Sequence, residues 1–220
     1  MKTAGLASLT LAAVLAGLAA TQEPKEVTTV QLPKPQTSGT MSLEQVIAQR
    51  RSVREFQPEP LSAEQIAQLC WAAQGITDRA RGFRAAPSAG ALYPLELYLV
   101  TKDGLYHYLP QQHALEQLGA KDLRSELARA ALEQAWVGDA PLTMVITAVM
   151  RRTAAKYGQR AERYCYIETG HAAQNVLLQA VALGLGAVPV GAYDDARVHR
   201  ALGLPNDRQA LYLIPIGKPG

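Results

Sequence analysis

The alternation of apolar and polar residues along the chain predicts helices and strands in mixed order. In residues 95–99, leucines alternate with Glu96 and Tyr98, which is the two-residue period of a strand with one buried face. Asp103-Gly104 then predicts a hairpin turn into a second strand. The same pattern predicts helices over 42–50, 62–75, 121–134, 162–185 and 195–202, and strands over 95–99, 105–109, 141–150, 187–190 and 210–216. Because these elements do not repeat as β-α-β units, the expected fold class is α+β.

Two of the expected helices begin with a capping box. Ser42 is followed three residues later by Gln45, and Ser62 by Gln65. In this motif the serine hydroxyl and the glutamine side chain each satisfy a backbone N–H group at the helix start. The long helix over 162–185 is apolar on several faces, which predicts burial nearly all round, at the centre of the domain or at an interface.

The first forty residues differ in composition from the rest of the chain. Lys2 precedes an apolar run rich in Ala and Leu that ends in small residues, which predicts an export signal over 1–20 and a periplasmic or secreted protein. The run is short for a transmembrane helix, so no membrane span is expected after cleavage. An uncleaved anchor and a cytosolic chain with an apolar start are the alternatives. Residues 21–40 are rich in Pro, Thr, Gln and Lys, which predicts a flexible linker before a folded domain over 41–220.

Composition argues against several classes of ligand. Apolar residues make up 48% of the chain, an ordinary share for a soluble globular protein. A net charge of +3 and arginines in small groups give no basic stripe for nucleic acid. The four histidines are scattered, so we expect no metal site. Cys70 and Cys165 lie in apolar surroundings, which favours two buried thiols over a disulfide.

A basic segment, RRSVREF, follows the first expected helix. Arg50, Arg51, Ser52 and Arg54 place three guanidinium groups and a hydroxyl within five residues. Such groups surround a phosphate with charge-assisted, often bidentate hydrogen bonds. The alternative is a solvated basic turn, because cations are favourable near a helix C-terminus in any case.

Two loops of small residues are candidates for contact with a flat ring. The first contains Pro87, Ser88 and Gly90 just before a strand. Such a turn lets backbone groups approach a ligand closely, although a tight loop without a ligand has the same composition. The second loop follows the long helix and lacks the spacing of a phosphate loop. Its candidate contact residues are Pro189, Val190, Gly191 and Ala192.

Four segments, in this order, resemble the nitroreductase superfamily, and more closely its SagB-type branch, which includes the azoline oxidases of peptide-modifying pathways. The segments are RRSVREF, LCWAAQGIT, RAAPSAGALYPLELYLV and KYGQRAERYCYIETGHAAQNVLLQAVALGLGAVPVGAY. The resemblance covers Leu43 to Pro219. It implies an FMN-dependent nitroreductase-like fold, with a central mixed or antiparallel sheet flanked by helices. It also implies a homodimer with one FMN at each of two interfacial sites.

The resemblance implies roles for individual residues. The FMN phosphate and ribityl chain would be held by Arg50, Arg51, Ser52 and Arg54. The flavin would be lined by Pro87, Ser88 and Gly90, which the partner subunit is a candidate to supply. The isoalloxazine would lie along Pro189, Val190, Gly191 and Ala192.

Lys156-Tyr157 matches the Lys-Tyr pair that azoline oxidases use near the flavin. An amine and a phenol there would act as base and acid while hydride moves. The alternative is a charged loop residue followed by a packing tyrosine. On the next helix, Glu168 and His171 stand three residues apart, a spacing that favours a structural polar pair over a catalytic one.

These observations predict an FMN-dependent oxidoreductase that transfers two electrons, as hydride, to or from a small conjugated organic substrate. In such enzymes the cofactor carries the chemistry and the protein positions it. Export would separate the protein from NAD(P)H, which is a cytosolic reductant. An exported flavin- or ligand-binding protein without turnover is therefore one alternative. A surface for an acidic partner at the arginine segment is another.

Overall fold

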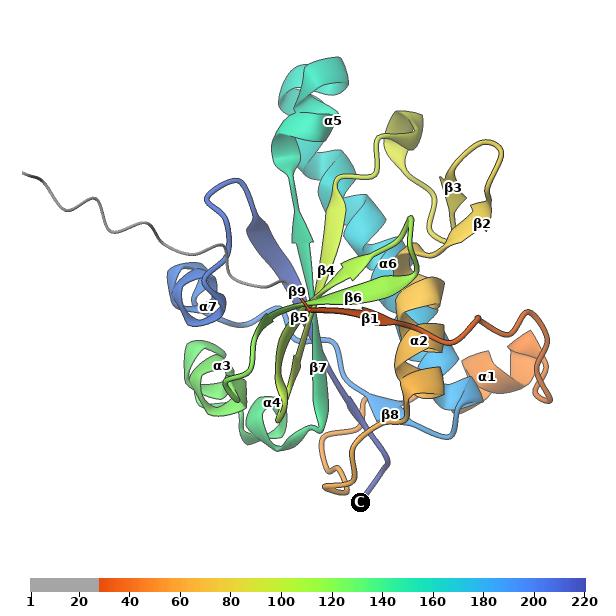
Figure 1. Ribbon diagram of the computed structural model, residues 1–220, viewed down its shortest axis with the longest axis vertical. Helices are drawn as coiled ribbons and strands as arrows, with labels where there is room; N and C mark the ends of the chain where they lie inside the picture. The colour runs from red at the N-terminus through yellow and green to blue at the C-terminus, as the bar shows by residue number, and fades with distance from the viewer. Residues whose placement is uncertain (1–27) are drawn as a thin grey trace, which may run out of the picture.

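A seven-stranded sheet organises residues 28–220, which are the residues that the computed structural model describes (Figure 1). In spatial order its strands are β1 (Thr28–Gln31), β6 (Ala114–Gly119), β5 (Gly104–Leu109), β4 (Leu95–Thr101), β7 (Leu142–Ala148), β9 (Gln209–Gly217) and β8 (Gly186–Ala187). Every neighbouring pair is antiparallel. The sheet is therefore antiparallel, one of the two forms that were expected. A separate hairpin pairs β2 (Ile76–Asp78) with β3 (Phe83–Arg84).

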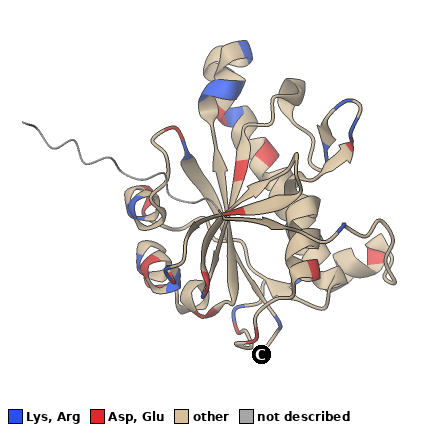
Figure 2. Ribbon diagram, viewed as in Figure 1, with Lys and Arg blue, Asp and Glu red and all other residues tan. Residues whose placement is uncertain are grey.

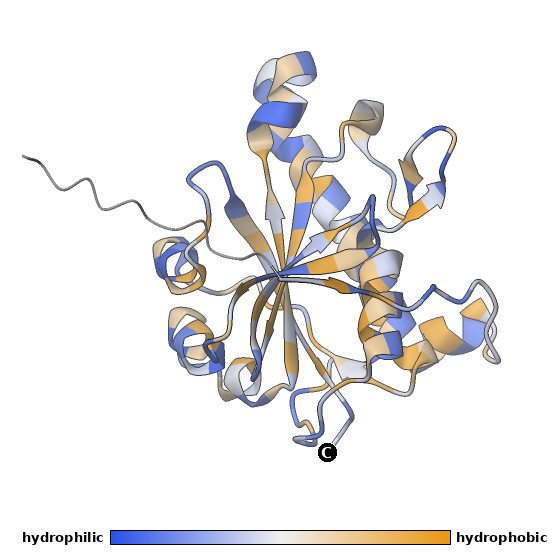
Figure 3. Cartoon of the chain, in the orientation of Figure 1, coloured by the Kyte–Doolittle hydropathy of each residue, from blue (hydrophilic) through white to orange (hydrophobic). Residues whose placement is uncertain are grey.

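Side chains on the strands alternate between two apolar cores, one on each face of the sheet. Figure 3 shows hydrophobic residues on the strands and on the helices that flank them. Leu97 and Leu99 of β4 belong to the core shared with α2 (Ala63–Gln74) and α6 (Ala161–Ala182). Tyr98 and Val100 belong to the other core. The helices on that face are α3 (Arg124–Ala130), α4 (Ala135–Asp139) and α7 (Asp195–Leu202). The alternation predicted for 95–99 thus places a helical layer on each side of the sheet, and the α+β class is confirmed.

The predicted export signal, residues 1–20, lies outside the described residues. The described part of the predicted linker, residues 28–40, is not a linker. Thr28–Gln31 pairs with β6, and the N–H of Gln36 donates to Oε1 of Gln68 on α2 at 2.8 Å. The β-branched Thr-Thr-Val run favours a strand. The surrounding prolines and polar residues led instead to the prediction of a linker. Among residues 28–220, none of the helices is long and apolar enough to cross a membrane.

One predicted helix and one predicted strand differ from the structure. The helix expected over 121–134 is shorter in the structure: α3 ends at Ala130, and Leu132 and Glu133, with φ of 59° and 60°, turn the chain before α4 begins at Ala135. These left-handed residues turn the chain so that Val137 of α4 enters the core beside α3. The strand expected over 141–150 stops at Ala148 and is followed by α5 (Met150–Tyr157), which was not predicted.

The long helix α6 is buried along one face within a single chain. Burial nearly all round at the centre of the domain is therefore not observed, and burial of the outer face at an interface stays a prediction. Tyr166 and Ile167, on its outer face, are each 46% exposed. The helix therefore has two apolar surfaces, and only one of them packs on the sheet within this chain.

We expect Ser62→Ala to lower the free energy of unfolding by about 1 kcal/mol. Both capping boxes are formed, and Ser62 Oγ accepts from the N–H of Gln65 at 3.2 Å. Urea denaturation measures the change. Ser38→Ala, at an exposed position without a cap, is the matched control and should leave stability unchanged. Equal stability of the two variants would show that the box contributes nothing.

Candidate active site

The arginine segment lies against the strand that follows α6. The N–H of Val53 donates to the carbonyl of Ala187 at 3.1 Å, and Ser52 and Ala187 form a parallel bridge. This approach requires a glycine at Gly186, because an added Cβ would lie 2.7 Å from Cβ of Val53, well inside normal carbon contact. The structure thus brings together two of the predicted segments, the arginines and the loop after α6.

The three arginines make different contacts. The Arg51 guanidinium donates to the carbonyls of Ala48 and Arg50 at 2.9 and 2.7 Å, so it caps the C-terminus of α1 (Leu43–Gln49). The Arg54 guanidinium stacks on Trp136, with Cζ 5.4 Å from the ring centroid. Among the described residues, the Arg50 side chain has no hydrogen-bond or ion-pair partner. Arg50 is therefore the arginine most available to an anion, and Arg51 the least.

The loop after β8 offers fewer backbone donors than its composition implied. The N–H of Val190 donates to Leu213 at 2.8 Å, and Pro189 has no N–H. Gly191 and Ala192 are exposed, and within residues 28–220 their N–H groups have no hydrogen-bond partner. The carbonyl of Ala192 accepts from Gln134 Nε2 at 2.8 Å, which holds the loop. Two of the four predicted residues can therefore donate to a ligand.

A second cluster joins the other loop to the end of α5. Pro87 and Ser88 lead into η1 (Ala89–Ala91), in which Gly90 has φ of 63°. A Cβ added to Gly90 would lie 2.9 Å from Oη of Tyr157 and 3.0 Å from Nζ of Lys156. Lys156 and Tyr157 are the last two residues of α5, not part of a loop. The structure therefore brings the predicted small-residue turn and the Lys-Tyr pair together.

The chain after Ser88 is strained. Ala91 and Tyr93 have φ of 54° and 46°, in the left-handed region that costs a non-glycine residue roughly 1–3 kcal/mol. Ser88 Oγ accepts from the N–H of Tyr93 at 2.9 Å, and Arg152 donates to the Tyr93 carbonyl at 3.0 Å. Strain of this kind persists only where the surroundings enforce it, and it is typical of functional sites.

A charged network beside the second cluster was not predicted. Glu96 of β4 forms an ion pair with Arg152 and lies 2.7 Å from Nε2 of His107. Burial by itself would raise the pKa of Glu96, but the hydrogen bond from His107 and the charge of Arg152 hold it below its ordinary value. The sequence contained one indication of this network, because Glu96 places a carboxylate between two leucines of a predicted strand.

Glu168 is buried and does not pair with His171. Its side chain is 3% exposed, whereas His171 is exposed, so the predicted polar pair is wrong. Burial raises the pKa of Glu168 to about 7, although a hydrogen bond with Ser88 and the charge of Arg84 act in the opposite direction. Within the described residues, Oε1 of Glu168 has no hydrogen-bond partner.

Stability is expected to fall as the pH rises from about 4.5 to about 7. In this window folded Glu168 still holds its proton, whereas the unfolded chain, with a pKa near 4.5, has released it. Because the folded state binds more protons, its free energy of unfolding decreases with pH, by roughly 3 kcal/mol across the window. Urea denaturation at both ends measures the fall, and Glu168→Gln should flatten it. Parallel curves for the two proteins would contradict the assignment.

The two clusters lie at opposite ends of the molecule. In Figure 1, α5 is at the top, and the C-terminus is at the bottom. The C-terminus is tied to the arginine segment because the N–H of Gly220 donates to Glu55 at 3.0 Å. Figure 2 shows Lys and Arg residues at both ends. One small ligand therefore cannot contact both clusters of the same chain.

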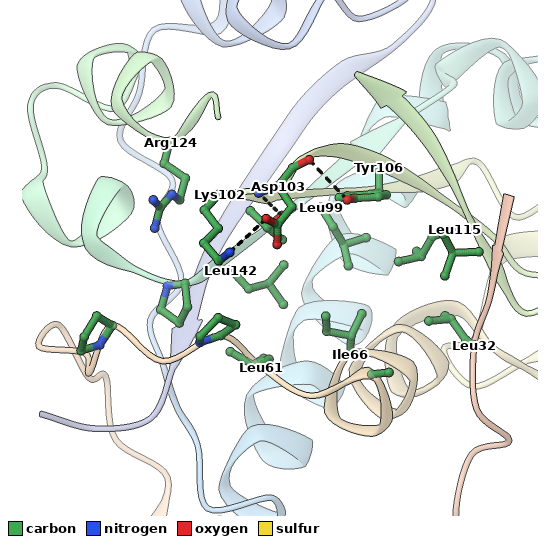
Figure 4. A pocket seen from close by; sticks show the side chains of 16 residues that line it. Leu32, Leu61, Ile66, Leu99, Lys102, Asp103, Tyr106, Leu115, Arg124 and Leu142 are labelled. Carbon is green, nitrogen blue, oxygen red and sulfur yellow. Dashed lines mark hydrogen bonds and ion pairs between the residues drawn. The ribbon is translucent and has the colours of Figure 1, made fainter. Parts of the chain in front are cut away.

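A cavity of about 190 Å³ lies elsewhere. Figure 4 shows Leu61 and Ile66 facing Leu99 and Leu142 across it, with Lys102 at its rim. None of the residues predicted to bind or react with a ligand lines this cavity. The candidate active site is therefore the pair of clusters at the two ends.

Comparisons with known proteins agree with the fold. A model of the nitroreductase family matches residues 47–218. MJ1384 of Methanocaldococcus jannaschii, which bears a nitroreductase name, is 41% identical over 184 residues, 81% of this chain and 91% of that protein. The microcin B17-processing protein McbC of Escherichia coli is 30% identical over 134 residues, 55% of this chain and 48% of McbC.

Solved structures give the same result. One from Ralstonia eutropha JMP134, also with a nitroreductase name, has a TM-score of 0.79 at 33% identity and covers 87% of this chain and 90% of that one. The NADPH:FMN oxidoreductase of Vibrio harveyi has a TM-score of 0.61 at 26% identity, with 80% and 68% coverage. The predicted nitroreductase-like fold is confirmed, and members of the family are flavin-dependent oxidoreductases. This chain belongs to the nitroreductase family.

Proposed function

We propose that this chain is an FMN-dependent oxidoreductase that moves two electrons to or from a small conjugated organic substrate. The observation that carries the proposal is the pair of clusters, one with phosphate-binding chemistry and one with acid–base chemistry. Bound FMN would supply the hydride chemistry. The chain itself binds the cofactor, orients the substrate and moves the proton.

The first cluster fits a phosphorylated flavin. Within residues 28–220 the Arg50 guanidinium has no partner, and Ser52 is exposed beside it. Arg54 adds a second cation, held in place by Trp136. Charge-assisted hydrogen bonds from arginines are the strong contacts to phosphate. The N–H groups of Gly191 and Ala192, which have no partner in the described part of the chain, would donate to polar atoms of the flavin ring.

The second cluster fits proton transfer to a substrate. Lys156 Nζ lies 5.4 Å from the centroid of the Tyr157 ring, within the range of a cation–π contact. Tyr157 Oη would donate a proton in the reductive direction and accept one in the oxidative direction. Tyr157 is half-buried and Lys156 exposed, so the pair faces the side from which a substrate can enter.

Two copies of the chain would combine the clusters. The outer face of α6 exposes Tyr166 and Ile167, and α1 exposes Leu43 and Ile47. Exposed apolar patches of this kind mark partner surfaces. In a homodimer the first cluster of one subunit would lie near the second cluster of its partner, as the family resemblance implies.

The finer assignment is to the SagB-type, azoline-oxidase-like branch. Lys156-Tyr157 at the end of α5 and the 30% identity with McbC support it. We also propose that residues 1–20 direct export, in which case the electron donor is not cytosolic NAD(P)H. The oxidative direction, with oxygen reoxidising the flavin, then needs no such donor.

Anaerobic half-reactions test the proposal. Purified protein loaded with FMN should be reduced by NADPH, NADH or a reduced heterocyclic substrate. The reduced protein should then be reoxidised by a nitroaromatic, a quinone or oxygen. Turnover with a heterocycle and oxygen, but not with nicotinamides, would support the azoline-oxidase branch. Bound flavin that no donor reduces, other than dithionite, would favour a binding protein without turnover.

A further inference from the structure

Tyr93 is held at each of its hydrogen-bonding groups. Its N–H donates to Ser88 Oγ at 2.9 Å, and its carbonyl accepts from the Arg152 guanidinium at 3.0 Å. Its hydroxyl accepts the N–H of Arg84 at 3.1 Å, and the Arg84 guanidinium lies over its ring, with Cζ 4.7 Å from the centroid. Because Tyr93 has φ of 46°, which non-glycine residues rarely adopt, these contacts hold the chain in a strained conformation.

Arg152 connects this strained residue to the sheet. One guanidinium nitrogen, Nη1, donates to the Tyr93 carbonyl, and the other, Nη2, forms the ion pair with Oε1 of Glu96. The second carboxylate oxygen, Oε2, lies 2.7 Å from Nε2 of His107. The Glu96 side chain is 10% exposed, and a buried carboxylate is costly unless charges and hydrogen bonds satisfy it. Glu96 therefore fixes the rigid fork of the Arg152 guanidinium in one orientation.

Arg152 also belongs to the helix that carries the candidate catalytic pair. It lies about one helical turn before Lys156 on α5. The turn over residues 88–93, which Arg152 contacts, presents Gly90 to the end of the same helix. A Cβ added to Gly90 would lie 2.9 Å from Oη of Tyr157. The arginine therefore joins the turn to the helix at one end of a short arm, and the turn meets the catalytic pair at the other.

We propose that Arg152, fixed by Glu96, is a positioning residue for the candidate catalytic pair. It holds the turn over residues 88–93 against Lys156 and Tyr157, and so sets where the amine and the phenol lie. The inference rests on the proposed function, in which that pair moves the proton. Displacing a reacting group by about 1 Å can cost about a hundred-fold in rate, so a contact remote from the substrate can still control the reaction.

Nuclear Overhauser effects between Gly90 and Tyr157 test the anchor whether or not FMN is bound. In the full-length chain, protonated only at glycine and tyrosine, the α-protons of Gly90 should give a cross-peak to the ring protons of Tyr157. Arg152→Ala should remove most of its intensity, because the turn loses its contact with α5. Arg151→Ala is the matched control, since Arg151 is the preceding residue of the helix and pairs instead with Asp207. It should leave the cross-peak unchanged.

Two conservative variants provide a test that does not depend on the alanine variant folding. Arg152→Lys keeps a positive charge beside Glu96 but has a single nitrogen, so it cannot contact Glu96 and Tyr93 through separate nitrogens. We expect it to fold and to lose the cross-peak. Glu96→Gln keeps an acceptor for Arg152 without the charge and should give an intermediate intensity. A cross-peak that both variants leave unchanged would overturn the proposal.

Kinetics then separate positioning from a purely structural role. With FMN bound, Arg152→Lys should slow the substrate half-reaction about tenfold, mainly in the rate at saturating substrate. Reduction by dithionite should be unchanged. Added to Tyr157→Phe, the same substitution should have little further effect, because it acts through Tyr157. An equal slowing in both backgrounds would show that Arg152 acts elsewhere and would overturn the positioning role.

The anchor and the proposed function can fail separately. A chain in which Arg152→Lys loses the cross-peak, but which binds no FMN, would refute the proposed function and leave the anchor of the turn intact. A chain that binds FMN and turns over, with its cross-peak and its substrate half-reaction unchanged by Arg152→Lys, would overturn the positioning role and leave the proposed function intact.

Discussion

Tyr157→Phe is expected to slow the substrate half-reaction by about a hundred- to ten-thousand-fold, the range of general acid–base catalysis. The substitution removes the phenolic hydroxyl and keeps the ring that packs on Tyr164, so the fold and FMN binding should persist. Reduction of the flavin by dithionite should be little affected, because it requires no proton donor at that position. Stopped-flow measurement of each half-reaction gives both rates.

Lys156→Ala should behave in the same way if the two residues act as a unit, and the double variant should then be little worse than either single one. Tyr106→Phe makes the same chemical change beside the separate cavity and is the matched control. A rate for Tyr157→Phe within about twofold of the parent would remove the catalytic role. Tyr157 would then be a packing residue, and only the flavin and backbone groups would remain as reactive elements.

Replacing Arg50 and Arg54 together by alanine is expected to weaken FMN binding by about a hundred- to ten-thousand-fold. Each lost charge-assisted contact to a phosphate costs roughly 1.5–3 kcal/mol, and the two losses should add to about 3–6 kcal/mol. Equilibrium titration of the flavin-free protein with FMN, followed by flavin fluorescence, measures the change. Between the single variants, Arg50→Ala should have the larger effect, because Arg54 is already engaged with Trp136.

Two arginine variants serve as controls for that titration. Arg79→Ala removes the same charge from the exposed turn between β2 and β3 and should leave FMN affinity within about twofold. Arg51→Ala should destabilise α1, because the Arg51 guanidinium caps that helix. The same variant should have little effect on FMN affinity. FMN affinity unchanged by the double replacement would place the phosphate elsewhere.

The sequence predicted those helices and strands whose ends are marked by a capping residue or a turn motif. Ser42, Ser62 and Asp103-Gly104 each identified an element that the structure contains. The predicted helix over 121–134 was too long, because tertiary packing there overrides the local apolar pattern. Leu132 and Glu133 have left-handed backbone conformations, and α3 ends before them at Ala130. The prediction was also wrong at β1, because four strand residues among prolines carry little signal on their own.

The candidate site shows the same division. Short motifs identified the residues of both clusters, but their pairing depends on long-range contacts such as Val53 with Ala187 and Gly90 with Tyr157. Sequence spacing gave Glu168 the wrong neighbour, since helical proximity to His171 does not show which of the two side chains is buried. The distinct roles of Arg50 and Arg51 likewise follow from which carbonyls lie within reach, which no motif states.

We expect this chain to bind FMN as a noncovalent cofactor. The most direct test is to denature the purified full-length protein and identify and quantify the chromophore that it releases. We predict about one FMN per subunit, released without proteolysis because no covalent link is expected. Release of FAD, or no flavin even after reconstitution with FMN, would contradict the account.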